Sequence, residues 1–392
     1  MIQIDNSDIT EQHSDFLKSY ASAASAPLVI HDFIAKSFPK LEERAYADRV
    51  KKLKKAGVID PQPFPYEVKI PKSLQEMIDG DFEPKKLLRI NEPIKGPYSN
   101  IWFGDTTDGI FFRWGYVNGD SRKISTEGLN DKTVHGFLGG ATGTGKSVTM
   151  NAIIFGACME YPPWELTLTL SDAKIVEFKT IATSQPMPHI DIVAATSDVD
   201  YMLSMLEEKR KEMKLRQSVF TKAAKVFGRP IKNIMEFREV TGLCMPRVMM
   251  VFDECTAMFQ NAGKRANKIG EAIDNIARLG RNAGFHLLLA SQEISSDLPD
   301  KTMANLTLRG AMGCTGPISE KILGNDEAVM NLGQKGKLIT NTSASQKNNK
   351  PLNVAIRVPW LPPESLNEIA NCTIKLGKEL GVTPVMRFYD EE

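Results

Sequence analysis

The pattern of hydrophobic and polar positions divides the chain into four parts. Residues 1–75 are polar, with helix-compatible stretches separated by prolines, which predicts a small, mostly helical N-terminal region. Residues 76–130 contain more prolines and then, from Ile101, aromatic and β-branched runs that predict a β-hairpin packing on the next domain. Residues 131–370 alternate short apolar runs with amphipathic stretches, and residues 371–392 are expected to form a tail.

The third part has the pattern of an α/β domain. Amphipathic helices are predicted at Ser147–Glu160 and Asp198–Arg216, and a polar loop at Ser343–Lys350 precedes a strand at Leu352–Val358. The runs that suit buried parallel strands are VHGFL (134–138), ELTLTL (165–170), VMMVF (248–252) and HLLLA (286–290). This alternation predicts a central, mainly parallel sheet.

The composition narrows the functional classes. Lys and Arg number 49 against 48 Asp and Glu, a net charge of +1, so any nucleic-acid site must be a local basic patch. The five cysteines form no CxxC pair, which argues against a disulfide framework and a cysteine zinc site. No apolar run approaches the roughly 20 residues that cross a bilayer, and the first residues lack a signal-peptide pattern. We therefore expect a cytoplasmic protein without membrane insertion.

Residues 140–147, GATGTGKS, match the phosphate-binding pattern GxxxxGK[ST] between a predicted strand and a predicted helix. Glycines let the backbone curl so that N–H groups point at phosphates, and the helix N-terminus adds partial positive charge. Lys146 is expected to reach the β- and γ-phosphates of ATP, and Ser147 to bind Mg²⁺. The alternative is a glycine-rich turn before an ordinary helix. The predicted nucleotide-binding residues are Gly140, Ala141, Thr142, Gly143, Thr144, Gly145, Lys146, Ser147 and Val148.

Two later strand ends carry candidate catalytic groups. The run RVMMVFDE ends in Asp253, predicted to hold Mg²⁺, and Glu254, predicted to activate water as a general base. The run HLLLA is followed by Ser291 and Gln292, and Gln292 could orient the attacking water beside the γ-phosphate. Taken alone, the acids could be solvated groups at a strand edge and Gln292 a polar strand terminus. The upstream phosphate loop favours the catalytic interpretation of the acids.

Two arginines flank Gly280 in the sequence IARLGRNAG. In ring ATPases an arginine from a neighbouring subunit often stabilises charge in the transition state, which makes Arg281 and Arg278 candidates for that role. The alternative is a solvated helix face with a terminal cation that the helix dipole favours.

Further basic residues could contact nucleic acid. Lys264, Arg265 and Lys268 lie in NAGKRANK, predicted as a glycine-containing loop that could grip phosphates without reading sequence. A solvated charged loop is the alternative. The run VKKLKK (50–55) follows several acids on the same predicted helix, so a salt-bridged solvent face is the favoured interpretation.

The histidines and aromatic residues favour packing roles. Three histidines lie in or beside apolar runs without metal-ligand spacing: His135, His189 and His286. The aromatic residues after Ile101 are predicted to form a core rather than a base-stacking platform: Trp102, Phe103, Phe111, Phe112 and Trp114.

Taken together, these motifs resemble the FtsK/SpoIIIE family of hexameric DNA translocases, over roughly residues 100–370. The segments that carry the resemblance are GGATGTGKSVTMNAI, SDAKIVEF, PHI, LEEKRKEM, IKNIMEF, VMMVFDE, IARLGRNAGFHLLLASQ, MANLTLRGAMGC, ILGNDEA, LGQKGKLI and VAIRVPWLPPESLNEI. The resemblance implies a RecA-like P-loop ATPase that assembles into a homo-oligomeric ring around double-stranded DNA and couples ATP hydrolysis to DNA movement. It also implies that Lys264, Arg265 and Lys268, and the region of Ser295–Lys301 with Lys301, face the channel.

The chain departs from the family pattern in ways that shape the expected role. Gln292-Glu293-Ile294 stands where the family usually has Gln-Arg-Pro, and we expect no membrane helices before the motor and no winged-helix domain after it. A short form of this kind would suit a phage or mobile element, in DNA transfer or packaging, with residues 1–100 free to bind a protein partner. The alternative function is a secretion ATPase of the EccC kind that acts on proteins. A non-hydrolysing scaffold is disfavoured because Lys146, Asp253 and Glu254 are all present.

Overall fold

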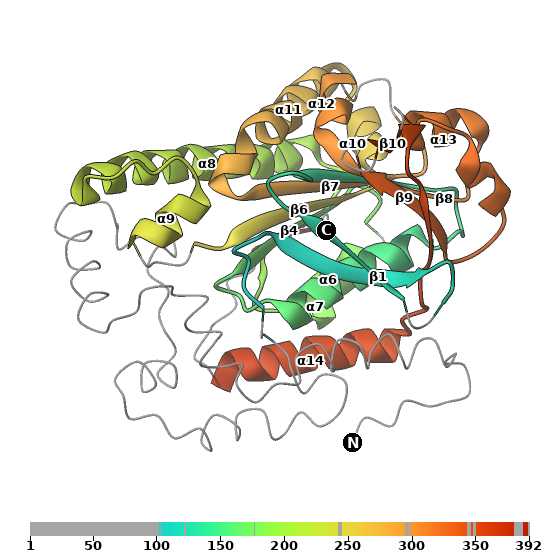
Figure 1. Ribbon diagram of the computed structural model, residues 1–392, viewed down its shortest axis with the longest axis horizontal. Coiled ribbons are helices and arrows are strands. Elements are labelled where there is room, and N and C mark those ends of the chain that lie inside the picture. Colours follow the sequence, from blue (N-terminus) through green and yellow to red (C-terminus); the bar gives the residue numbers. More distant parts are fainter. Residues whose placement is uncertain are drawn as a thin grey trace.

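The computed structural model describes residues 102, 104–120, 123–175, 177–241, 245–294, 298, 300–342, 346–347, 350–379 and 387–390 (Figure 1). The predicted helical region 1–75, the linker that follows it and the VKKLKK run lie outside the described residues.

Most of the described strands belong to one large mixed sheet. Its 11 described strands run in the order β13-β5-β4-β6-β7-β3-β8-β9-β12-β1-β2. The strands are β1 (Ile110–Val117), β2 (Ile124–Leu129), β3 (His135–Gly139), β4 (Leu166–Asp172), β5 (Ile190–Ala195), β6 (Arg247–Asp253), β7 (Phe285–Ser291), β8 (Leu306–Met312), β9 (Lys337–Thr342), β12 (Val354–Arg357) and β13 (Arg387–Asp390). From β13 to β8 all neighbours are parallel, and from β8 to β2 all are antiparallel. The predicted central, mainly parallel sheet is confirmed.

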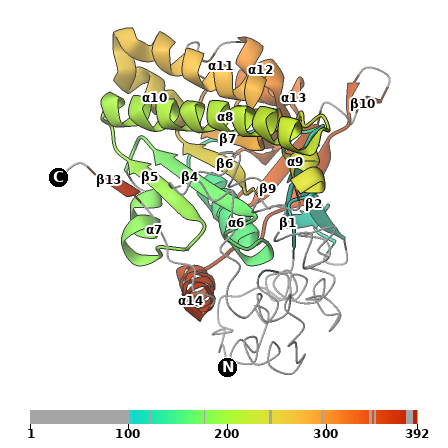
Figure 2. The same cartoon turned by 90° about the vertical axis from the view of Figure 1, so that its left-hand side faces the viewer.

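Helices cover both faces of the sheet (Figures 1 and 2). One face carries α6 (Lys146–Glu160), α7 (Phe178–Ser184) and α14 (Pro363–Glu379). The other carries α8 (Val199–Phe227), α10 (Cys255–Ala262), α11 (Ala266–Ala283), α12 (Asp300–Asn305) and α13 (Gly316–Leu323). Two short 3₁₀ helices, η1 (Gly263–Arg265) and η2 (Glu327–Asn331), complete the second layer.

Each face of the sheet has its own hydrophobic core. The first core packs α6 and α7 against the sheet and includes Phe112 and Trp114 of β1. The second packs α8, α10 and α11 against the opposite face. The central strands β6 and β7 are buried along their whole length, which explains why the sequence shows them as continuous apolar runs.

The aromatic segment forms the predicted hairpin, and the hairpin extends the sheet. β1 pairs antiparallel with β2 and also with β12. The hairpin therefore belongs to the same sheet as β3, the strand that precedes GATGTGKS. Trp102, Phe112 and Trp114 are buried, which confirms their predicted core role, whereas Phe111 is half-buried. β13, from the predicted tail, pairs with β5 at the other edge of the sheet.

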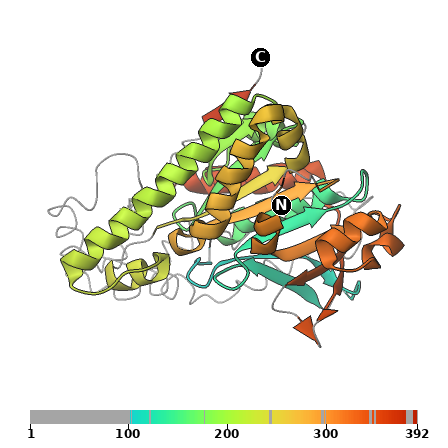
Figure 3. The ribbon, with the colours of Figure 1, turned by 90° about the horizontal axis from the view of Figure 1, so that it is seen from above.

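The long helix α8 extends well beyond the predicted end at Arg216 (Figure 3). Two buried cations attach α8 to its neighbours: Lys209 pairs with Asp191 of β5, and Arg216 donates to the carbonyls of Pro246, just before β6 (2.7 Å), and Ala283, at the end of α11 (3.0 Å). At its far end α8 packs on α9 (Ile234–Thr241) in a separate small core. The buried cations of α8 therefore have carboxylate or carbonyl partners within the fold.

Two local predictions need correction. The segment NAGKRANK is not a loop, because it includes the end of α10, the turn η1 and the start of α11. The predicted loop Ser343–Lys350 contains paired residues: β10 (Gln346–Lys347) pairs antiparallel with β11 (Lys350–Pro351). Neither deviation was visible in the sequence, because both segments are polar and glycine, serine and asparagine are frequent in them.

Candidate nucleotide site

The candidate site residues lie at the C-terminal ends of four parallel strands: β3, β4, β6 and β7. These strand ends form one edge of the sheet, called here the nucleotide edge. Gly139, at the end of β3, is in register with Ser291, at the end of β7. Asp172, at the end of β4, is in register with Asp253, at the end of β6. Since the carboxyl ends of parallel strands meet at the same edge, the phosphate loop, both acids and Gln292 are gathered there.

The phosphate loop joins β3 directly to α6. Gly143 and Gly145 have φ angles of 78° and 107°, a left-handed region that favours glycine. Thr144 closes the turn by donating from its hydroxyl to the carbonyl of Ala141 at 2.7 Å, and Ala141 N–H donates to the carbonyl of Gly313 at 2.9 Å. The glycines of the motif are therefore required by the backbone path at the N-terminus of α6.

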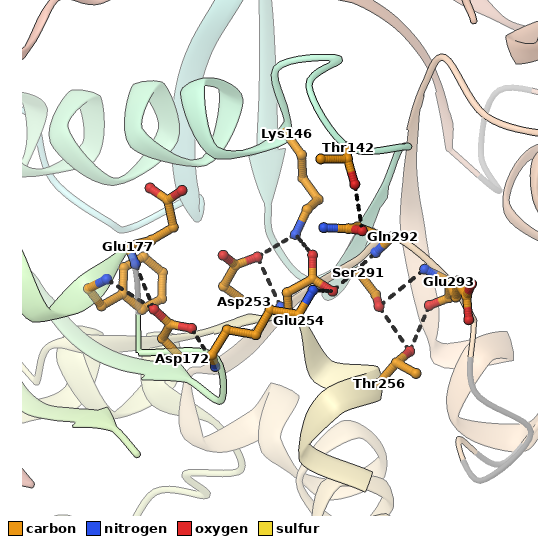
Figure 4. Close-up of polar contacts among 12 residues, drawn as sticks. Thr142, Lys146, Asp172, Glu177, Asp253, Glu254, Thr256, Ser291, Gln292 and Glu293 are labelled. Carbon is orange, nitrogen blue, oxygen red and sulfur yellow. Dashed lines mark hydrogen bonds and ion pairs between the residues drawn. The ribbon is translucent and has the colours of Figure 1, made fainter. Parts of the chain in front are cut away.

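Lys146 contacts both Asp253, the last residue of β6, and Glu254, which follows it (Figure 4). Its Nζ is 2.5 Å from Oδ1 of Asp253 and 2.6 Å from Oε1 of Glu254. All three side chains are less than a tenth exposed. Their ion pairs span more than a hundred residues of sequence, so the predicted lysine and acids form one buried cluster.

The electrostatics of this cluster favour the ionised forms of Lys146 and Glu254, whereas burial raises the pKa of Asp253. Burial opposes the charge of Lys146, but the ion pairs with Asp253 and Glu254 outweigh it and raise the pKa of the lysine. Burial likewise opposes the charge of Glu254, but Lys146 and Lys174 outweigh it and lower the pKa of Glu254. Glu254 is thus an anion, which is the form a general base requires.

Glu254 has a backbone conformation that is unusual for a residue other than glycine. Its φ is 49° and ψ is 50°, at the corner where β6 passes into α10. Its N–H donates to Oδ1 of Asp253 at 2.9 Å, which fixes the corner. Left-handed conformations of such residues are rare and occur preferentially at functional sites, where the surrounding structure stabilises them.

Gln292 connects the phosphate loop to Glu254. Its side-chain oxygen accepts from the hydroxyl of Thr142 at 2.8 Å, and its N–H faces Oε2 of Glu254 at 3.4 Å. Thr256 supports this strand end by donating to the carbonyl of Glu293 at 2.7 Å and accepting from Ser291 at 2.9 Å. The structure therefore places Gln292 beside the phosphate loop, where the sequence suggested a residue that orients the attacking water.

Mg²⁺ prefers oxygen ligands and is usually held by one or two carboxylates together with substrate phosphates and water. Asp253, at the end of β6, and Ser147, in the first turn of α6 next to Lys146, carry oxygen donors of this kind. Among the described residues no group of three or more His, Cys, Asp or Glu side chains is arranged to hold a metal without such help. The donor set therefore fits a magnesium ion that arrives with a nucleotide.

The structure adds Asp172 and Lys174 to the site; their segment, SDAKIVEF, carries part of the family resemblance, but neither residue was predicted to belong to the site. Lys174 Nζ is 3.3 Å from Oε2 of Glu254, and Asp172 holds the turn on which Lys174 lies. The available signal was the position of SDAK after an apolar run, like the acids after β6. Only the sheet order, with β4 next to β6, shows that the two strand ends meet.

The two arginines do not approach this edge. Arg278 and Arg281 are exposed on the last turns of α11, where Gly280 lies against Phe285 at the start of β7. The nucleotide edge is at the other end of β7, about 20 Å away at roughly 3.3 Å per residue. Within one subunit neither arginine reaches the predicted phosphates.

The basic residues predicted to contact DNA lie in the helical layer, on η1, the start of α11 and α12. Lys264 and Lys268 are exposed, on η1 and α11. Arg265 pairs with Asp200 of α8 at 2.5 Å, and Lys301 pairs with Asp274 of α11 at 3.0 Å. The Arg265–Asp200 pair lies at the surface and is therefore weak. In the second pair the lysine is exposed, whereas the carboxylate of Asp274 is buried.

Comparison with known proteins gives the family of this region. Residues 118–296 match the model of the FtsK/SpoIIIE family. This segment is an FtsK/SpoIIIE-family domain. It contains the phosphate loop, Asp253, Glu254 and Gln292, so the resemblance stated from the motifs is confirmed.

Curated relatives include the DNA translocase FtsK of Helicobacter pylori, which is 30% identical over 255 residues. That match covers 64% of this chain and 27% of the relative. The DNA translocase SftA of Bacillus subtilis is 27% identical over 222 residues, covering 55% of this chain and 22% of the relative. The chain thus matches about a quarter of the length of these relatives.

Solved structures share the fold of the FtsK/SpoIIIE-family domain. The cytoplasmic domain of the Thermomonospora curvata type VII secretion ATPase EccC matches with a TM-score of 0.58 at 20% identity, covering 74% of this chain and 34% of that one. The pCW3 conjugation coupling protein TcpA matches with a TM-score of 0.53 at 19% identity, covering 70% and 73%. The fold is therefore that of P-loop ATPases. Among the described helices none is both long and apolar enough to cross a membrane.

Proposed function

We propose that this chain is an ATP-dependent double-stranded DNA translocase that works as a homo-oligomeric ring, a hexamer. The observation that carries the proposal is the buried cluster of Lys146, Asp253 and Glu254 beside the phosphate loop of an FtsK/SpoIIIE-family domain. All three groups that a P-loop ATPase needs for phosphate binding, metal binding and water activation are present in it.

In the proposed reaction Lys146 moves from the acids to the β- and γ-phosphates when ATP enters the loop. Ser147 and Asp253 would hold a Mg²⁺ ion, which would supply positive charge to the phosphate oxygens. Glu254 accepts a proton from water as the water oxygen bonds to the γ-phosphorus and the bond to the β-phosphate oxygen breaks, giving ADP and phosphate. Gln292, held between Thr142 and Glu254, orients that water.

The ring supplies what one subunit lacks. Arg278 and Arg281 are exposed and far from the phosphate loop of their own subunit, so we assign the predicted catalytic arginine to a site on the neighbouring subunit. Lys264, Arg265, Lys268 and Lys301 are proposed to contact DNA phosphates. On binding, Arg265 would exchange its exposed partner Asp200 for a phosphate, and the exposed ammonium of Lys301 would turn from the buried carboxylate of Asp274 to a phosphate.

ATP hydrolysis with and without linear double-stranded DNA, at two salt concentrations, tests the proposal. We expect DNA to stimulate hydrolysis, and the stimulation to fall with salt because phosphate contacts release counterions. Glu254→Gln serves as the matched control, because it keeps the size of the side chain and removes the base. Displacement of a third strand bound to the duplex then measures movement along DNA.

Two results would contradict the proposal in different ways. Hydrolysis that is absent in Glu254→Gln but indifferent to DNA would support the alternative, a motor of the EccC kind that acts on proteins. A rate equal in the wild type and Glu254→Gln would show that this cluster does not hydrolyse ATP. The more detailed expectation, that the DNA is that of a phage or mobile element in transfer or packaging, stays a prediction.

A further inference from the structure

The ion pairs of Glu254 raise a question of charge balance during the proposed reaction. In the structure Lys146 contacts Oε1 of Glu254 at 2.6 Å. The proposed mechanism requires the same ammonium group to move to the phosphates. Glu254 then loses its nearest cation while its carboxylate, 7% exposed, stays at a buried strand end. A second positive group must hold the carboxylate, since an unpaired buried charge is costly.

Lys174 is placed to be that group. Its Nζ is 3.3 Å from Oε2 of Glu254, the carboxylate oxygen that Lys146 does not contact. The N–H of Gln292 faces the same oxygen at 3.4 Å. The two oxygens of Glu254 therefore have separate cations, and departure of Lys146 leaves the contacts of Oε2 in place.

The turn that carries Lys174 is built around a buried carboxylate. Asp172 accepts at 2.9 Å from the N–H of Lys174, at 2.7 Å from that of Glu177 and at 3.3 Å from that of Phe178 (Figure 4). Between these residues Ile175 has a φ of 60°, a rare conformation for a β-branched residue. Because Asp172 is also in register with Asp253, the turn is fixed relative to the acid strand.

This arrangement differs from an ordinary surface ion pair. Surface pairs contribute little because two flexible side chains must be immobilised in water. Here the carboxylate is 7% exposed and its backbone is fixed at the corner of β6 and α10, while the backbone of Lys174 is held by Asp172. Only the lysine side chain, 44% exposed, has to be ordered.

We propose that Lys174 is a positioning residue for Glu254, which holds the carboxylate in place once Lys146 has moved to the nucleotide. The inference rests on the proposed ATPase function and deepens it. Lys174 acts through Glu254 rather than on the phosphates. It therefore affects the rate of hydrolysis and leaves the affinity for nucleotide unchanged.

The test compares Lys174→Met and Lys174→Arg with the wild type. For Lys174→Met we expect kcat to fall on the order of tenfold to 100-fold, the cost of a misplaced catalytic group. The Kd for a fluorescent ATP analogue should stay within about twofold, and Lys174→Arg, which keeps the charge, should recover most of the rate. Lys211→Met, on the exposed face of α8, is the matched control for loss of a lysine.

A double-mutant cycle shows whether the effect passes through Glu254. In a Glu254→Gln background, Lys174→Met should change the residual single-turnover rate by less than about twofold, because the charge that Lys174 holds is gone. A crystal structure of the wild type with a non-hydrolysable ATP analogue should show Lys146 on the phosphates and Lys174 still within ion-pair distance of Glu254. Lys174→Met should show a displaced Glu254 side chain in the same complex.

Three results would overturn the inference. The first is that Lys174→Met hydrolyses ATP within twofold of the wild-type rate. The second is that it loses nucleotide affinity with kcat unchanged, which would make Lys174 a phosphate ligand. The third is that Lys174→Met lowers the hydrolysis rate by the same factor in the wild-type and Glu254→Gln backgrounds. Failure of the proposed function has a different signature, since the wild type would then hydrolyse ATP no faster than Glu254→Gln.

Discussion

Two buried histidines make the stability of this fold sensitive to acid. His135 donates from Nε2 to the carbonyl of Ala277 at 2.8 Å, and its Nδ1 accepts from the N–H of Leu287 at 2.9 Å. His189 donates from Nε2 to the carbonyl of Tyr161 at 2.7 Å. Both are neutral packing residues, as the sequence predicted, and burial lowers the pKa of each from 6.5 to about 4.

The size of the effect follows from the difference in proton binding between folded and unfolded chains. A histidine with a lowered folded pKa binds protons more readily when unfolded, so its contribution to stability is full above pH 6.5 and is lost as pH falls toward 4. At pH 5 the unfolded side chain is almost fully protonated and the folded one about a tenth protonated. With 1.36 kcal/mol per pKa unit, each histidine costs about 2 kcal/mol at pH 5 relative to pH 8.

His189→Gln isolates one of these contributions, because the glutamine amide can still donate to the carbonyl of Tyr161 but does not titrate. Urea unfolding of the wild type and the variant at pH 8 and pH 5 gives the four free energies required. We expect the loss of stability between the two pH values to be about 2 kcal/mol smaller in His189→Gln. A difference below about 0.5 kcal/mol, or one of opposite sign, would refute the assignment of His189 as a buried neutral residue.

Three further predictions concern the site and its support. Glu254→Gln should keep ATP binding, because the phosphate loop is intact, and lower kcat by about 10²- to 10⁴-fold; a parallel loss of affinity in a binding titration would contradict the role of general base. Arg238→Ala should destabilise the fold by about 3–5 kcal/mol in urea unfolding, because it leaves the fully buried carboxylate of Glu165 without its ion-pair partner; a loss below about 1 kcal/mol would contradict this. Subunits with Arg281→Ala and subunits with Glu254→Gln should each be inactive alone. When they are mixed, part of the hydrolysis rate should return, because Arg281 of a Glu254→Gln subunit can then complete the site of a neighbour that keeps Glu254. The absence of any recovery in mixed rings would exclude Arg281 as the residue acting in trans.

The phosphate loop and the acid strand were predictable because their signals are local. GATGTGKS needs left-handed glycines and a following helix, and the structure has both at Gly143 and Gly145. The run VMMVFDE is a strand buried on both faces that ends at the nucleotide edge, which is why it reads as apolar residues followed by acids. The family resemblance, carried by several such segments in order, was confirmed for residues 118–296.

Other features depended on contacts between distant segments. Lys174 and Glu254 are eighty residues apart, and they meet only because β4 lies next to β6 in the sheet. Polar segments such as NAGKRANK have no hydrophobic period, so their assignment to helix came from packing against the second core. The charge of Arg265 could be counted from the sequence, but its pairing with Asp200 could not.

The sequence by itself determined which chemical groups the chain carries and which of them stand at strand ends, because backbone conformation and burial on both faces leave local patterns. Only the tertiary structure decided which groups meet, since the order of parallel strands is set by long-range packing and not by neighbouring residues. That order brings Lys146, Asp253, Glu254 and Lys174 into one cluster. It leaves Arg278 and Arg281 at the end of α11, near the N-terminal end of β7 and away from the nucleotide.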